Sequence, residues 1–141
     1  LKAVENRKKE GTTDRGGRTI GYSYLMQKDT INGTFWLRNH EKFCLQSITQ
    51  NTSASEHKGS YLDLALIYAA LGEMEKAYEC LEETEERDSY PLWWVTMMRN
   101  EPPFNIMRNE PRFQQILHRI EEKYQKQHDE VKEWLMEEGI L

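Results

Sequence analysis

The sequence predicts an all-α fold made of antiparallel helical hairpins. Residues 61–88 have the pattern of one complete hairpin, a similar pattern occurs earlier in the chain, and a further helical pattern fills the C-terminal region. With 141 residues, of which 38% are hydrophobic and 30% charged, the chain has the length and composition of a single globular domain with its own core.

The hairpin in 61–88 is defined by apolar residues at helical spacing on both sides of a glycine. The first helix carries Tyr61, Leu64, Ala65 and Tyr68, and the second carries Met74, Ala77, Tyr78 and Leu81. Gly72 interrupts the period where an open or left-handed backbone is needed. Two helices joined by so short a turn must pack antiparallel, and we expect Ala65 and Ala77 at their closest crossing.

A second copy of this pattern appears when the chain is aligned on its small residues. Gly21 precedes Gly33 by as many positions as Ala65 precedes Ala77. The accompanying pairs are Ile20 with Leu64, Tyr24 with Tyr68, and Leu37 with Leu81, and Lys28-Asp29 stands where the other copy has its turn glycine. A helical glycine costs about 1 kcal/mol relative to alanine, so we expect close packing at Gly21 and Gly33 to compensate.

The C-terminal region contains a five-residue string twice, at 98–102 and 107–111, each followed by a phenylalanine, Phe104 or Phe113. Proline suits the first turn of a helix, and we expect the asparagine of each string to cap free backbone N–H groups there. The second copy opens a predicted helix from Pro111 to Tyr124. Its apolar face predicts a structural plug and end-cap rather than a ligand-binding motif.

The segment LALIYAALGEMEKAYECLEE resembles a tetratricopeptide repeat, whose signature matches here at Leu64, Ala65, Tyr68, Gly72, Ala77 and Leu81. An ordinary amphipathic hairpin is the alternative. Followed by the string MRNEPRFQQIL, the segment is similar to the C-terminal end of the tetratricopeptide-type regions of bacterial multidomain signalling proteins, whose last helix begins R-x-D-P-R-F. Arg108, Glu110, Pro111, Arg112 and Phe113 occupy that motif, with Glu110 in place of aspartate.

This resemblance implies hairpins stacked as a short α-solenoid, with an atypical C-terminal helical cap. Repeat 1 would span about 15–50, repeat 2 about 58–88, and the cap and last helix 89–141, all within one domain that is a fragment of a longer protein. It also implies a non-catalytic protein-interaction or regulatory module of a signalling or transcription-regulatory protein. The alternatives are a small-molecule sensor with an apolar pocket between its helices and a non-catalytic subunit of an enzyme.

No catalytic residue, cofactor or metal site is predicted. The chain lacks a phosphate-binding glycine loop and the usual metalloprotease and hydrolase motifs. Cys44 and Cys80 are expected to be reduced thiols rather than disulfide or metal ligands. His40 and Cys44 have the i, i+4 spacing of two metal ligands on one helix face, but the sequence offers no obvious third.

A net charge of −5 argues against nucleic-acid binding, and no apolar run reaches the roughly 18 residues of a membrane span. We therefore expect a cytoplasmic protein that binds a protein or peptide. The candidate binding surface comprises Arg15, Arg18, Tyr22, Met26, Leu62 and Leu66. Repeats that grip a partner's C-terminal carboxylate carry Lys and Asn at set positions of the first helix, which correspond here to Arg18, Tyr22, Leu62 and Leu66. This departure argues against such a clamp, so an apolar or mixed segment is the expected ligand. Leu62 and Leu66 could instead be buried by a neighbouring helix.

The tail, 121–141, continues the helical pattern with a narrow apolar face that includes Tyr124, Val131 and Leu135. Gly139 is a plausible helix stop. Such a face needs a covering surface. Either it folds back on the chain's own repeats, or Trp134 and its neighbours pack against a second copy and form a homodimer.

Overall fold

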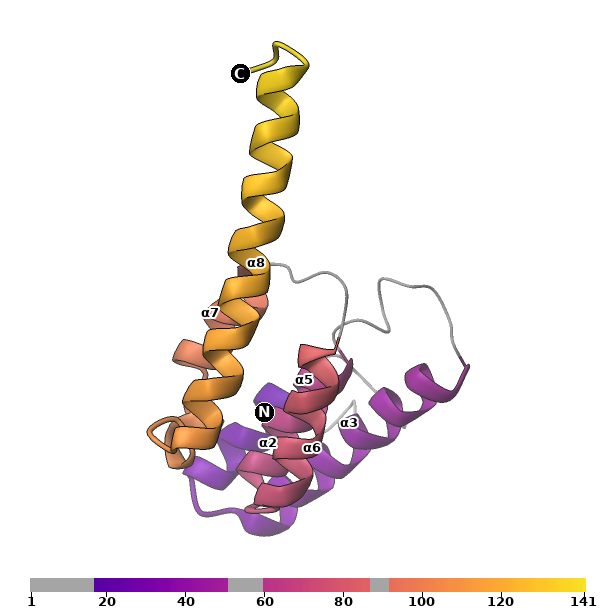
Figure 1. The fold of residues 1–141 in the computed structure, drawn as a ribbon. Coiled ribbons are helices and arrows are strands. Elements are labelled where there is room, and N and C mark those ends of the chain that lie inside the picture. The colour runs from indigo at the N-terminus through magenta and orange to yellow at the C-terminus, as the bar shows by residue number, and fades with distance from the viewer. Residues whose placement is uncertain (1–16, 51–59, 87–91) are drawn as a thin grey trace. The chain divides into compact units, whose positions relative to one another are not determined.

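The computed structural model describes residues 17–50, 60–86 and 92–141 (Figure 1). Within these ranges every regular element is a helix, which confirms the all-α prediction. The elements are α2 (Gly17–Met26), α3 (Thr30–Gln50), α5 (Ser60–Ala70), α6 (Met74–Glu85), α7 (Leu92–Asn100), the 3-10 helix η1 (Pro102–Ile106) and α8 (Pro111–Glu137). The chain forms two compact units, Leu1–Asp63 and Leu64–Leu141, and the boundary between them falls inside α5.

In the first unit α2 packs directly on α3, and two glycines set the distance between them. A Cβ atom on Gly21 would lie 2.7 Å from Cγ of Leu37 and 3.0 Å from the carbonyl oxygen of Gly33. A Cβ atom on Gly33 would lie 2.6 Å from Cδ2 of Leu25. These distances are shorter than normal contacts, so the backbones approach as closely as they do only because both residues lack a side chain. The predicted close crossing at Gly21 and Gly33 is confirmed.

The turn of each hairpin contains one residue in the left-handed region, Lys28 (φ 63°) in the first and Gly72 (φ 77°) in the second. In both turns the next amide N–H donates to the carbonyl oxygen five residues earlier, Asp29 to Tyr24 at 2.9 Å and Glu73 to Tyr68 at 2.8 Å. This hydrogen bond is the one that ends helices in the Schellman motif. The lysine therefore has the backbone conformation that glycine has in the other hairpin.

Replacing Lys28 by glycine should stabilise the chain by roughly 0.5–1 kcal/mol. A left-handed conformation costs a non-glycine residue about 1–2 kcal/mol, and the greater freedom of glycine in the unfolded chain offsets part of the gain. The matched change is Gly72→Ala, which should lose about 1 kcal/mol although a Cβ atom there meets nothing within 4 Å. Urea unfolding midpoints of the two variants should move in opposite directions, and a shift of both in the same direction would contradict this explanation.

In the second unit α5 is buried on nearly every side from Leu64 to Ala69, so it is more than an amphipathic helix with one apolar face. Ala65 and Ala77, the predicted crossing residues, are both fully buried. The ammonium group of Lys76 lies 5.3 Å from the centre of the Tyr68 ring, across the turn. The short connection between α5 and α6 thus forms a turn across which Lys76 contacts Tyr68, and the crossing at Ala65 and Ala77 stays a prediction.

The repeated string brings two phenylalanines into one core. Phe104 and Phe113 are fully buried, with ring centres 5.3 Å apart. The expected asparagine caps are wrong, because the N-cap residues of η1 and α8 are Glu101 and Glu110, and neither makes a capping hydrogen bond with its side chain. Proline occupies the first turn of both helices, where its missing N–H has no hydrogen bond to lose.

The acidic side of α6 is attached to α8 by arginines. Arg112 pairs with Glu75 at 3.1 Å and with Glu82 at 2.8 Å, and its guanidinium group lies 4.3 Å from the centre of the Tyr78 ring. Arg119 pairs with Glu85 at 2.5 Å. The acidic residues of α6 are therefore not all free in solvent, because three of them pair with the arginines of α8.

Tyr78 completes the contact between α6 and α8 by donating its hydroxyl hydrogen to the carboxylate of Glu110. Burial, followed by this hydrogen bond and the charge of Glu110, raises the pKa of Tyr78. Each of these effects favours the neutral hydroxyl. Stability from Tyr78 is therefore complete below the pKa of an unfolded tyrosine, about 10, and is lost as the pH rises above that value.

Tyr78→Phe should remove this alkaline loss. We expect the free energy of unfolding of the unmodified chain to fall more steeply than that of the variant between about pH 9 and pH 11. At neutral pH the variant should lose only about 1 kcal/mol, because exposed Glu110 regains water. Equal slopes for the two proteins in urea unfolding across this pH range would show that Tyr78 keeps its ordinary pKa.

Candidate functional site

Most of the residues of the candidate binding surface do not lie together on an open surface. Leu62 and Leu66 are fully buried in the core. Their assignment to a binding surface is therefore wrong, and the alternative, that they are buried within the fold, holds. The physical reason is that α5 is apolar almost all round. Arg15 lies outside the described residues.

The remaining residues of that surface differ in exposure. The guanidinium group of Arg18 lies 3.5 Å from the carboxylate of Asp63 and is mostly shielded from solvent. Tyr22 is half-buried and Met26 is exposed. Of the apolar side chains predicted to bind a partner from the first unit, Met26 is therefore the one that solvent reaches freely.

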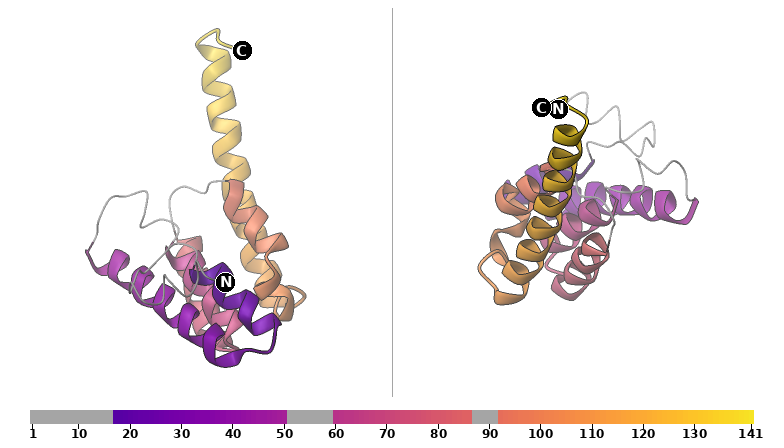
Figure 2. Two further views of the ribbon diagram at one scale, coloured as in Figure 1. Left: turned by 180° about the vertical axis from the view of Figure 1, so that it is seen from behind. Right: turned by 45° about the horizontal axis from the view of Figure 1, so that its top comes forward.

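Trp134 has a different environment, in the last part of α8. The N-terminal part of α8 packs on α6 and α7, and its buried side chains are Phe113, Ile116, Leu117 and Ile120. The distal segment, which we define as residues 126–141, continues beyond α7 in Figure 1 and in the left view of Figure 2. All its residues are exposed except Gln127 and Leu135, which are half-buried. The exposure of the segment shows no fold-back onto the described helices of its own unit, whereas a fold-back onto the first repeat, which belongs to the other unit, stays a prediction.

Large apolar side chains are exposed along the distal segment. Trp134 is 54% exposed and Val131 is 56% exposed, and Met136, Ile140 and Leu141 are exposed as well. Tyr124, Gln127, Val131 and Trp134 follow one another at alternating steps of three and four residues, the spacing of a helix that packs along another helix. The segment also carries five carboxylates and two lysines, a net charge of −3. It is an acidic helix with an uncovered apolar face.

The end of this helix is well defined. Gly139 has φ 71°, and the N–H of Ile140 donates to the carbonyl oxygen of Leu135 at 2.9 Å. The predicted helix stop at Gly139 is confirmed. In this type of helix end the residue after the glycine commonly contacts the residue whose carbonyl it bonds, which agrees with the partial burial of Leu135.

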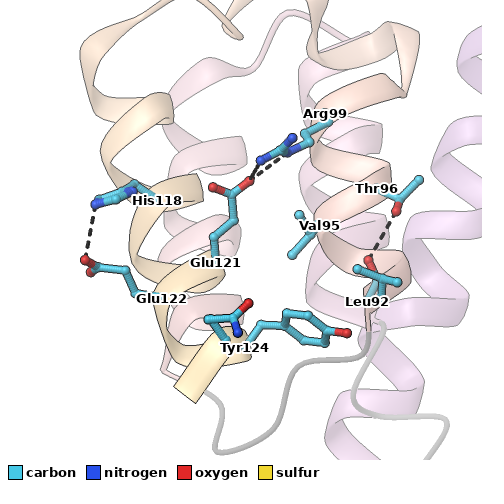
Figure 3. Close-up of a pocket in the computed structure, with 9 residues that line it drawn as sticks. Leu92, Val95, Thr96, Arg99, His118, Glu121, Glu122 and Tyr124 are labelled. Atoms are coloured by element: carbon cyan, nitrogen blue, oxygen red, sulfur yellow. Dashed lines mark hydrogen bonds and ion pairs between the residues drawn. The ribbon is translucent and has the colours of Figure 1, made fainter. Parts of the chain in front are cut away.

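A groove of about 510 Å³ lies between α7 and the middle of α8 (Figure 3). Arg99 of α7 reaches across it to Glu121 of α8, and its Nε donates a hydrogen bond of 2.7 Å. The other lining side chains are Leu92, Val95, Thr96, His118, Glu122, Tyr124 and Gln125. This groove is open to solvent and is crossed by the Arg99–Glu121 ion pair, whereas the small-molecule sensor requires an apolar pocket between the helices, so the sensor alternative stays a prediction.

A cluster of three polar side chains, two buried and one half-buried, lies in the first unit. His40 and Cys44 lie one turn apart on α3, almost fully buried, and Asp63 approaches them from the start of α5. Nε2 of His40 is 3.4 Å from Oδ2 of Asp63. The spacing of His40 and Cys44 was visible in the sequence. Asp63 was not identified with them, because it is 19 positions beyond Cys44 and only the fold brings it near.

None of the helices in the described ranges is both long enough and apolar enough to cross a bilayer. The comparisons with other proteins do not assign a family. No protein-family model, no curated protein and no solved structure matches this chain significantly.

Proposed function

We propose that this chain is a non-catalytic protein-interaction module of a bacterial signalling or transcription-regulatory protein, and that it binds its partner through the distal segment of α8. The tetratricopeptide-like hairpins support the class of protein, because such arrays serve mainly as binding scaffolds. The observation that carries the proposal is the uncovered apolar face around Val131 and Trp134.

An uncovered helix of this kind is poorly stable on its own. Most helical stability in proteins comes from packing of the apolar face, and short isolated helices are marginal in water. Large aromatic residues are also enriched among those that dominate binding energy at interfaces. A partner that covers Trp134 and Val131 would therefore stabilise the helix and bury the side chains that contribute most to the binding energy.

The charge of the segment indicates the chemistry of that partner. Its carboxylates belong to Asp129, Glu130, Glu133, Glu137 and Glu138. Two such acidic segments repel each other, which disfavours the homodimer. A partner helix with an apolar face flanked by Lys and Arg complements both the apolar residues and the charge, and this is the partner class that we propose.

A pair of synthetic peptides tests this function. Both are helical with leucine at the contact positions of each heptad, and they differ only in flanking residues, Lys and Arg in one and Glu in the other. The intact chain should bind the basic peptide, with affinity that falls as salt is added, and should not bind the acidic one. Fluorescence anisotropy of labelled peptide measures both.

The chain offers a closely matched control for the aromatic anchor. Trp134→Glu should weaken binding of the basic peptide at least tenfold, whereas Trp93→Glu should not, although Trp93 on α7 is similarly exposed at 49%. Equal losses in the two variants would contradict a site on the distal segment. Sedimentation tests the homodimer separately. If the chain is a dimer, and Trp134→Glu dissociates it while Trp93→Glu does not, the partner of the distal segment is a second copy of this chain and not a basic helix.

A further inference from the structure

We propose that His40, Cys44 and Asp63 bind a divalent transition-metal ion of the zinc class in the first unit. One ligand atom from each residue, a ring nitrogen, the thiol sulfur and a carboxylate oxygen, lies within 4.8 Å of the other two. The site is independent of the distal segment of α8, and its failure would leave the proposed interaction function untouched.

The positions of the three residues follow from local structure. His40 and Cys44 face the same side of α3 because they are one helical turn apart. Both are at most 2% exposed, so their ring and sulfur are shielded from water. Asp63 stands in the first turn of α5 and points its Oδ2 atom toward Nε2 of His40. Two helices thus bring three ligands together, with His40 and Cys44 buried and Asp63 half-buried at the edge of the cluster.

The donor set selects the class of metal. A thiolate and an imidazole favour Zn²⁺ and its relatives over Mg²⁺ or Ca²⁺, which prefer oxygen ligands alone. Thiolate, carboxylate and neutral imidazole together carry two negative charges, which balance a divalent cation. Three protein ligands leave a fourth tetrahedral position for water or another donor.

The distances require only a modest closing movement. Bond lengths of about 2.0–2.3 Å in a tetrahedral zinc site place neighbouring ligand atoms roughly 3.3–3.8 Å apart. The 3.4 Å between Nε2 of His40 and Oδ2 of Asp63 already has this value. The remaining separations, within 4.8 Å, can close by a change of about 1 Å, within the reach of side-chain rotation.

Arg18 is placed to hold Asp63 in position. Its guanidinium group lies 3.5 Å from Oδ1 of Asp63, whereas Oδ2 faces His40. One carboxylate oxygen therefore has a cationic partner and the other is directed into the cluster. Metal-bound carboxylates are commonly oriented by such outer partners. The charge of Arg18 also opposes that of the metal, so it lowers the affinity of the site while fixing its geometry.

Cobalt titration of the intact, reduced chain tests the proposal. Co²⁺ bound to a thiolate gives a charge-transfer absorption in the near ultraviolet, so one equivalent should produce this band, and added Zn²⁺ should abolish it. Cys44→Ala should eliminate the band and Cys80→Ala should retain it, since Cys80 is the other cysteine and lies outside the cluster. Asp63→Asn should weaken Co²⁺ binding at least tenfold.

A chemical measurement on the unmodified chain removes any dependence on how well the variants fold. Zn²⁺ alone should slow alkylation of Cys44 at least tenfold and leave Cys80 unchanged, as measured by mass spectrometry of the digested protein. Absence of a cobalt band, a band that survives Cys44→Ala, or equal alkylation of Cys44 with and without Zn²⁺ would each overturn the site.

Discussion

Ala77→Arg should lower the free energy of unfolding by at least about 4 kcal/mol. Ala77 is fully buried on α6. An arginine there would either bury an unpaired charge or force the helices apart, and both belong to the few mechanisms that cost this much. A domain of this size has about 5–15 kcal/mol of stability in total, so one substitution removes a large part of it.

Glu79→Arg is the matched control, since it introduces the same residue two positions further along the same helix at an exposed site. Its stability should change by less than about 0.5 kcal/mol. Circular dichroism during urea unfolding measures both variants. If Ala77→Arg lost less than about 1 kcal/mol, the close packing around α6 would be refuted.

Gly21→Val should destabilise the chain by about 3 kcal/mol, the upper part of the range for overpacked sites. Even the first side-chain atom, Cβ, would lie 3.0 Å from the backbone nitrogen of Leu37 and 3.0 Å from the carbonyl oxygen of Gly33. Backbone atoms cannot rotate away as a side chain can, so α2 must move off α3. The better helix propensity of valine offsets only a few tenths of a kcal/mol.

Ser23→Val provides the comparison, because Ser23 is exposed on the same helix. Valine there should change stability by less than about 0.5 kcal/mol. The melting temperatures of the two variants separate the effect of steric overlap at Gly21 from the effect of helix propensity, which both variants share. Equal melting temperatures would show that the two glycines are not required for the approach of α2 to α3.

The sequence indicated local features of the fold that depend on neighbours in the chain. Gly21 and Gly33 were recognised from their match to Ala65 and Ala77, and close approach explains why glycine is tolerated in a helix. The turn at Lys28 was found in the same way, although lysine itself gives no sign of a positive φ. Periodicity and small residues report on the packing of adjacent helices.

Features that depend on distant residues were not predictable in this way. Arg112 was noted only as part of the resembled motif at the start of the last helix, and only the fold sets it over Tyr78 and against the acids of α6. Asp63 joins His40 because the start of α5 lies beside α3. The narrow apolar face of the distal segment was visible, but whether it is covered depends on where the rest of the chain lies, and a stripe of side chains does not contain that information.

Amide hydrogen exchange of the distal segment tests most directly whether it binds a partner. In the free chain residues 126–141 should exchange rapidly, because nearly all of their side chains are exposed, while residues 111–120 should be protected by their buried face. The basic amphipathic peptide should slow exchange at least tenfold in residues 126–141 and leave residues 17–50 unchanged. Strong protection of the distal segment in the dilute free chain, or unchanged exchange at saturating peptide, would contradict its role as the binding surface.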